Sequence, residues 1–212
     1  MPDGERLRAD LARYYDQDAI ARSRRALTDE RVARRAWFAA RLAEEGRRRL
    51  LEIGTGPGID GAAFAAAGLE VAGVDLSPVH VGLARAAGID AYVAPAHRLP
   101  FADGSFDALW CMSVLMHLPD ADLEMALAEF ARVLRPGALA AFGTWGGDGT
   151  EGPNPDDTID PPRYFHWRTD ASMRGAVERH ARVEAFESWT VPGRSGRPFR
   201  YQWCVARFGP LP

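Results

Sequence analysis

The sequence predicts a doubly wound α/β fold, with a mostly parallel β-sheet, a C-terminal antiparallel hairpin and an N-terminal helical cap. Two observations predict it. Between residues 49 and 144, short apolar runs alternate with segments of helical periodicity, the pattern of parallel strands joined by crossover helices. Two longer strand-like segments, 182–191 and 199–208, then follow with only a turn between them. Five strands and this hairpin make a sheet of seven.

The helical cap is expected in residues 1–46. Residues 5–45 are rich in Arg and Ala, and Val32, Ala36, Ala39 and Ala43 recur at helical spacing.

The first two strands, 49–54 and 71–76, enclose a glycine-rich turn. The stretch from Leu50 to Gly58 is an apolar run that includes the acid Glu52 and continues into glycines at positions 54, 56 and 58. Glycine lets the backbone turn tightly and approach a ligand with no Cβ in the way. The second strand ends in another acid, Asp75, and Ser77-Pro78 then marks a helix start.

Three further strands complete the parallel part of the sheet. The third is expected at 91–94 and the fourth, which is almost wholly apolar, at 106–113. Apolar residues at helical spacing across 123–134 predict a helix, which Pro136-Gly137 is expected to end before a fifth strand at 138–144.

The remaining segments lead to the hairpin. Residues 146–162 are rich in Gly, Pro and Asp without periodicity, which predicts a loop. A last helix is expected from Thr169 or Asp170 to about residue 180, and 192–196 is expected to form the hairpin turn. The whole chain is predicted to form a single domain, with a core at 48–145 followed by a loop, a last helix and the closing hairpin at 146–212.

Strand, glycine loop, helix, strand and acid together form the layout of a nucleoside-binding unit. Two cofactors fit this layout. Gly56, Gly58 and Gly61 match the GxGxxG of dinucleotide enzymes, whereas glycines 54, 56 and 58 match a GxGxG pattern. Glu52 favours the second pattern, because a buried carboxylate suits a cationic ligand and repels a pyrophosphate.

Four motifs in order across about residues 48–145 resemble the class I S-adenosylmethionine-dependent methyltransferases, in particular the bacterial small-molecule enzymes of types 11 and 25. They are the GxGxG loop, the acid at 75, the LPFADGSFD segment at 99–107 and the RVLRPG turn at 132–137. The resemblance implies a Rossmann-like, seven-stranded sheet and S-adenosylmethionine as cofactor. It implies a cofactor site made of Glu52, Gly54, Thr55, Gly56, Gly58, Asp75, Leu76, Ala96, His97, Met112 and Ser113.

One position departs from the family pattern. The segment before LPF often reads Gly-Asp-Ala in the family, with the acid accepting from the adenine amino group, but here Pro95 stands at the acid's place. Adenine recognition is therefore expected to use the Ala96 amide, packing, or His97.

Candidate acceptor residues are mainly aromatic. Substrate-binding candidates are Tyr15, Trp145, Tyr164, His166, Trp167 and Tyr201, and Trp110 is expected in the core. His117 is the candidate catalytic residue, with a cofactor or structural contact as its alternative role. Methyl transfer from a sulfonium mainly needs alignment of donor and acceptor, and a base only where a proton must leave.

Composition narrows the function class. The 212 residues carry a net charge of −3 and include Arg but no Lys, so no bulk attraction to nucleic acid is expected. Cys111 and Cys204 lie in apolar runs and are expected in the core, and the scattered histidines offer no metal-ligand spacing. Without an apolar run of membrane-spanning length or a signal-like segment, we expect a cytoplasmic protein; the oligomeric state stays open.

These observations favour methyl transfer to a small-molecule acceptor. One alternative is a catalytically silent binding protein of the same fold. Another is an NAD-dependent oxidoreductase, although a Tyr/Lys hydride-transfer pair is excluded because the sequence has no Lys.

Overall fold

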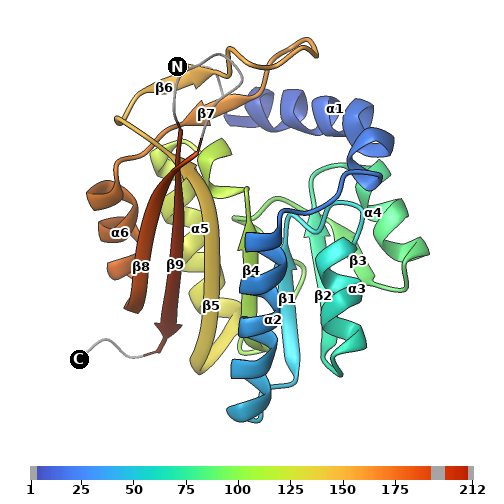
Figure 1. Ribbon diagram of the computed structural model, residues 1–212, viewed down its shortest axis with the longest axis vertical. Coiled ribbons are helices and arrows are strands. Elements are labelled where there is room, and N and C mark those ends of the chain that lie inside the picture. The colour runs from blue at the N-terminus through green and yellow to red at the C-terminus, as the bar shows by residue number, and fades with distance from the viewer. Residues whose placement is uncertain (1–3, 192–198, 210–212) are drawn as a thin grey trace.

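A seven-stranded sheet forms the centre of the computed structural model, which describes residues 4–191 and 199–209. The strand order is β3-β2-β1-β4-β5-β9-β8 (Figure 1). The first five of these strands pair in parallel, and β9 pairs antiparallel with both β5 and β8. The strands are β1 Arg49–Ile53, β2 Glu70–Asp75, β3 Asp90–Val93, β4 Phe106–Met112, β5 Leu134–Gly146, β8 Ala181–Val191 and β9 Phe199–Phe208. The predicted fold class is confirmed.

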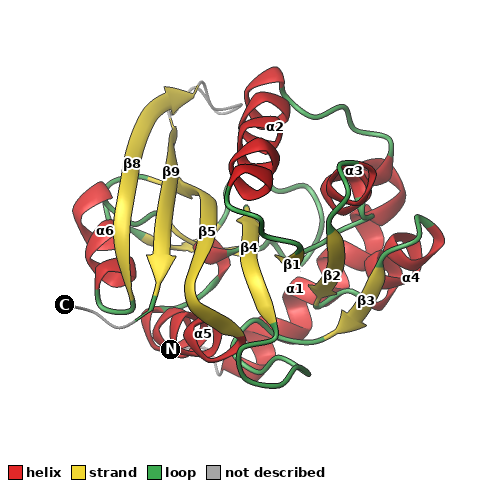
Figure 2. Ribbon diagram, turned by 90° about the horizontal axis from the view of Figure 1, so that it is seen from below, coloured by secondary structure: helices red, strands yellow, loops and turns green. Residues whose placement is uncertain are grey.

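Helices cover both faces of the sheet (Figure 2). The helices are α1 Gly4–Ser23, α2 Asp29–Glu44, α3 Ile59–Ala66, α4 Pro78–Ala86, α5 Asp120–Val133 and α6 Asp170–Glu178, with a short 3-10 helix, η1, at Leu115–His117. Residues of α2 and α3 pack with one face of β4, and residues of α5 and α6 pack with the other. The first helix, α1, lies across the carboxyl ends of the parallel strands (Figure 1).

The helix starts follow the predicted capping residues. Ser77 Oγ accepts from the amide of His80 at 3.0 Å with Pro78 as the first residue of α4, and Thr169 caps α6. An oxygen side chain at this position satisfies a backbone amide that the helix itself leaves free.

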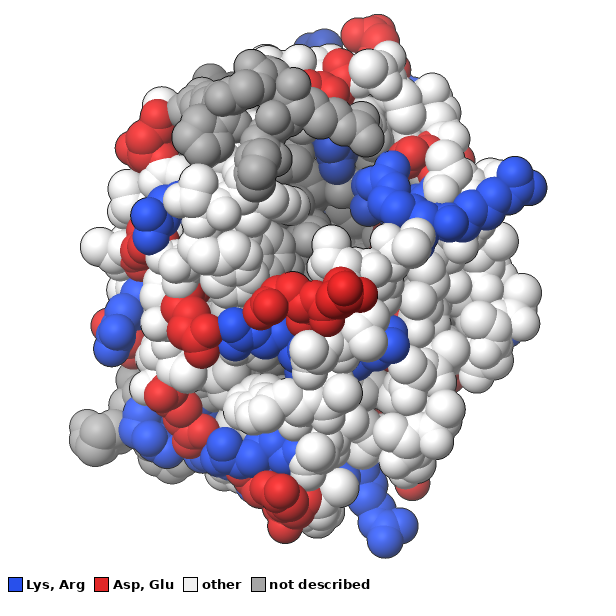
Figure 3. Space-filling model, in the orientation of Figure 1, with Lys and Arg blue, Asp and Glu red and all other residues white. Residues whose placement is uncertain are grey.

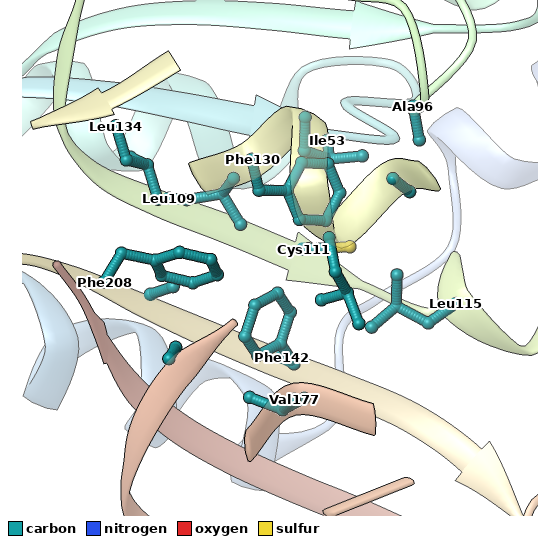
Figure 4. Packing of buried hydrophobic residues seen from close by; sticks show 14 of the residues in the cluster. Ile53, Ala96, Leu109, Cys111, Leu115, Phe130, Leu134, Phe142, Val177 and Phe208 are labelled. Carbon is teal, nitrogen blue, oxygen red and sulfur yellow. The ribbon is translucent and has the colours of Figure 1, made fainter. Parts of the chain in front are cut away.

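Alternation along β4 divides the core in two. Leu109 and Cys111 face the α5–α6 layer, shown in Figure 4, whereas Trp110 faces α2 and α3. Trp110 is fully buried and donates to Asp60 at 3.0 Å. Cys111 and Cys204 are buried and free. The predicted core positions of both cysteines and of Trp110 are confirmed.

The end of α5 differs from the prediction. The helix ends at Val133, and Leu134 already pairs with Phe106 as the first residue of β5. Pro136-Gly137 therefore does not end a helix but lies inside β5, where the register shifts between Phe106 and Ala108. A proline is tolerated at such an irregularity because the regular ladder is interrupted there.

The predicted loop at 146–162 is wrong in part. Glu151–Pro153 forms β6, which pairs antiparallel with β7, Tyr164–His166, in a second sheet. Strands of three residues are too short to show an alternating pattern in the sequence. The predicted hairpin turn at 192–196 lies outside the described residues.

Charges of both signs are mixed on the face shown in Figure 3. On α2, Arg34 pairs with Glu30 at 2.7 Å and Arg41 with Glu45 at 2.8 Å, and both arginines also reach acids of β8. This face therefore shows no stripe of one sign. None of the helices in the described part of the chain combines the length and the hydropathy that crossing a membrane requires.

Candidate methyl-transfer site

A cavity of about 790 Å³ lies between α1 and the carboxyl ends of the parallel strands. Ligands of open parallel sheets bind at this edge, because the loops after the strands converge there. Its lining joins residues that follow β1, β2, β3 and β4 with aromatic residues of β5, β8 and β9.

Asp75 organises one end of the cavity. The carboxylate of Asp75 accepts from the amide of Gly56 at 2.8 Å and from the amide of Ser77 at 2.9 Å. Each carboxylate oxygen has a further lone pair. Asp75 therefore fixes the glycine loop and can still accept from a ligand hydroxyl. Leu76, the next residue, lines the same end.

The glycines of the loop have different roles. Gly54 has a φ of +70°, and a Cβ there would lie 2.3 Å from Val114 Cγ2, so only glycine fits this position. Gly54 and Gly56 line the cavity. Gly58 is not among the lining residues; a Cβ there would meet Ala84 Cα at 3.0 Å, so Gly58 allows α4 to pack closely.

Glu52 is a buried acid at the floor of the cavity. It is 2% exposed and accepts from Thr55 Oγ1 at 2.8 Å. Burial, together with the nearby acid Asp60, raises the pKa of Glu52 to about 8. Arg31 and Arg35 of α2 bind Asp60 at 2.6 and 2.8 Å. Sequence reasoning did not single out these partners, because they lie on different helices.

The adenine end predicted at 94–97 also lines the cavity. Ala96 is buried and His97 half-buried, and burial lowers the pKa of His97. No acid stands at position 95, but Asp122 of α5 lines the cavity and binds Arg8 at 2.9 Å. The sequence motifs did not indicate Asp122 as a residue of the cavity either.

Aromatic residues form the opposite end. Trp145, Tyr201 and Trp189 stand directly opposite one another on β5, β9 and β8, with ring centroids 5.0 and 5.3 Å apart. Phe199 lies 6.1 Å from Trp145. Residues opposed across neighbouring strands project from the same face, so the sheet builds a continuous aromatic wall. We call these four residues the aromatic wall.

Met112 is the last residue of β4 and Ser113 follows it, and both residues line the cavity. Ser113 has a φ of +59°, rare for a residue with a side chain, and its amide donates to the Gly143 carbonyl. Tyr15 of α1 also stands here, where its hydroxyl lies 2.8 Å from Nε2 of the buried His117. Both residues line the cavity.

The family model described as "Methyltransferase domain" matches residues 51–142, which include the glycine loop, Asp75 and Ser113. The core of this chain is therefore similar to a methyltransferase domain over these residues. An uncharacterized methyltransferase of Mycobacterium sp. (strain JLS) is 41% identical over 133 residues, which cover 60% of this chain and 52% of that protein. A ubiquinone biosynthesis O-methyltransferase of Xanthomonas oryzae pv. oryzae (strain PXO99A) is 33% identical over 139 residues, covering 62% and 56%. The chain therefore matches little more than half the length of these curated relatives.

A solved structure shows the same fold over nearly the whole chain. It is the 1,6-didemethyltoxoflavin-N1-methyltransferase of Burkholderia thailandensis with bound 1,6-didemethyltoxoflavin and S-adenosylhomocysteine. The TM-score is 0.73 at 24% identity, covering 99% of this chain and 92% of that one. At this identity the likeness shows the fold; together with the family model and the curated relatives it confirms the predicted resemblance to the methyltransferase family.

Three of the predicted acceptor residues do not line the cavity. The hydroxyl of Tyr164 donates to Glu151 at 2.5 Å, the ring of His166 lies 3.3 Å from Asp120, and Trp167 is buried against Phe165. Because side chains alternate along a strand, β7 directs Phe165 to the cavity instead. The sequence did not predict a strand at Tyr164–His166, so this alternation of side chains was not expected.

Within the described residues, no cluster of three His, Cys, Asp or Glu side chains could hold a metal ion.

Proposed function

We propose that this chain transfers the methyl group of S-adenosylmethionine to a small organic acceptor. The observation that carries the proposal is the single cavity with two unlike ends. Asp75 and the glycine loop form a polar end suited to a nucleoside, and the aromatic wall forms an apolar end. A volume of about 790 Å³ lies within the range of small-molecule sites.

The residues at the polar end fit the cofactor. Asp75 would accept from the ribose hydroxyls with the lone pairs that Gly56 and Ser77 leave free. Glu52 would face the cationic amino acid part, and Leu76, Ala96 and His97 would surround the base. Thr55 holds the Glu52 carboxyl in place, and Met112 and Ser113 would flank the methionine part.

When bound, S-adenosylmethionine supplies a methyl group on a positively charged sulfur, which keeps the electron pair of the broken bond while the acceptor atom forms the new one. The chain mainly has to align the two molecules, since alignment alone can supply about 7–11 kcal/mol. The aromatic wall would hold the acceptor at the required place. The small molecule bound to the Burkholderia enzyme, 1,6-didemethyltoxoflavin, and the ubiquinone biosynthesis named for the Xanthomonas enzyme support a small-molecule acceptor.

Substitution of Asp75 tests the proposal. Two charge-assisted hydrogen bonds of about 1.5–3 kcal/mol each should make Asp75→Ala bind S-adenosylhomocysteine at least about a hundredfold more weakly. Titration calorimetry measures this, with the exposed Asp103→Ala as a matched control. Unchanged affinity in a folded Asp75→Ala variant would contradict the assignment.

Turnover separates the alternatives. Release of S-adenosylhomocysteine with an acceptor panel of phenols, heteroaromatic N–H compounds and amines supports methyl transfer. Binding without turnover on any acceptor would favour the catalytically silent protein, and tight NAD binding would favour the oxidoreductase.

A further inference from the structure

The hydrogen bonds of His117 define where its proton lies. Nδ1 of His117 is 2.9 Å from the backbone carbonyl of Tyr164, and a carbonyl only accepts, so Nδ1 carries the hydrogen. The ring is buried, and burial is the main cause that lowers the pKa of His117 to about 3. The ring is therefore neutral, and Nε2 has a lone pair and no hydrogen.

This tautomer determines the orientation of the Tyr15 hydroxyl. Since Nε2 of His117 can only accept, the hydroxyl of Tyr15 donates its hydrogen to it across 2.8 Å. Arg163 Nη1 donates to the same oxygen at 3.3 Å. Toward the cavity, Tyr15 can thus offer an acceptor lone pair but no hydrogen.

Tyr15 stands between the two ends of the cavity. On one side its ring lies 5.7 Å from His80, whose Nδ1 is 3.6 Å from Asp75. On the other side, His117 packs edge-on against Phe165 at 4.7 Å, and Phe165 belongs to one apolar cluster with Trp145 and Phe199. These contacts link the polar end to the aromatic wall through Tyr15 and His117.

We propose that Tyr15 selects a methyl acceptor whose reacting atom carries hydrogen, a hydroxyl or N–H on a flat aromatic ring, and that His117 positions Tyr15 for this task. The aromatic wall accounts for the flat ring, and the lone pair of Tyr15 accounts for the donor. This inference rests on the proposed function. His117 is a positioning residue here, because its Nε2 accepts the hydrogen of Tyr15 and its Nδ1 hydrogen is donated to the Tyr164 carbonyl.

Binding of two probes to the full chain saturated with S-adenosylhomocysteine tests the inference. The probes are 2-naphthol, which has a donor hydrogen, and 2-methoxynaphthalene, which has only an acceptor oxygen. We expect the wild type to prefer 2-naphthol by at least about fivefold in equilibrium dialysis, the value of one neutral hydrogen bond. Tyr15→Phe should reduce the preference to within about twofold.

Two variants of His117 separate positioning from a merely structural role. Gln can accept from Tyr15 through its amide oxygen but cannot take up a proton, so His117→Gln should keep the preference for 2-naphthol. His117→Leu leaves the Tyr15 hydrogen free to donate to the methoxy oxygen, so the preference should fall at least about threefold. The melting temperature and the S-adenosylhomocysteine affinity of each variant show whether it is folded.

Several results would overturn the inference. These are equal or undetectable binding of the two probes by the wild type, an unchanged preference in Tyr15→Phe, or a His117→Gln variant that behaves like His117→Leu. Loss of S-adenosylhomocysteine binding in Tyr15→Phe with the preference retained would assign Tyr15 to the cofactor. A wild type that fails to bind S-adenosylhomocysteine would refute the proposed function, and this inference with it.

Discussion

Replacing Glu52 by Gln should change how the stability of the empty protein depends on pH. The carboxyl of Glu52 is buried beside Asp60, and its pKa is raised from 4.5 to about 8. Between these two values the folded protein holds a proton that the unfolded chain has released. The free energy of unfolding therefore falls as pH rises through this window, and the loss is complete above about pH 8.

The size of the effect follows from the two pKa values. Their difference corresponds to at most about 5 kcal/mol, of which about 2.5 kcal/mol falls between pH 6 and pH 9. Gln resembles the protonated acid in shape and can still accept from Thr55 Oγ1, so Glu52→Gln should lack this loss. Typical domains have only about 5–15 kcal/mol of stability, so the difference is measurable.

Urea denaturation of both proteins at pH 6, 7, 8 and 9 provides the measurement. All other titrating groups are common to the two chains, so the difference between the two stability curves isolates Glu52. We expect the stability of the variant relative to the wild type to increase by about 2–3 kcal/mol between pH 6 and pH 9. Parallel curves would show that Glu52 titrates normally and would refute the interpretation.

Three further predictions concern the cavity. Gly143→Ala would place a Cβ 2.3 Å from Tyr201 Oη, so we expect the free energy of unfolding, measured by thermal denaturation, to fall by about 1–3 kcal/mol. The second substitution Tyr201→Phe should restore part of this stability, and no restoration would contradict the contact. Phe165→Ala should raise the KM of the acceptor at least about fivefold while S-adenosylhomocysteine affinity stays within about threefold, and Tyr164→Ala, outside the cavity, should leave both unchanged; the reverse order would refute the orientation of β7. Because Pro95 replaces an acid, the adenine amino group has no charged acceptor at position 95. An S-adenosylhomocysteine analogue in which hydrogen replaces this amino group should therefore lose less than about tenfold in binding affinity. A larger loss of affinity in calorimetry would indicate that Asp122 accepts from the amino group.

The polar end of the cavity could be predicted from the sequence because its parts are local. Glu52 lies in β1 and the glycines follow this strand; Asp75 ends β2, and Ser77 caps α4 two residues later. Parallel pairing of β1 with β2 is then enough to bring the glycine loop and Asp75 together. The seven strands of the large sheet were predictable for the same reason, because the apolar residues that indicate each strand lie within one short segment of the sequence.

Tertiary structure alone decided the acceptor end and the orientation of Tyr15. Tyr15 and His117 are 102 residues apart, and the carbonyl that determines the tautomer of His117 belongs to Tyr164, 47 residues further along. The pairing of β7 with β6 orients the side chain of Phe165, and not those of its neighbours, toward the cavity. The aromatic wall depends on the register of β5, β9 and β8. A single-residue slip in that register would turn each ring to the opposite face. Sequence periodicity specifies which residues share a face within one element, but packing between elements specifies which faces meet.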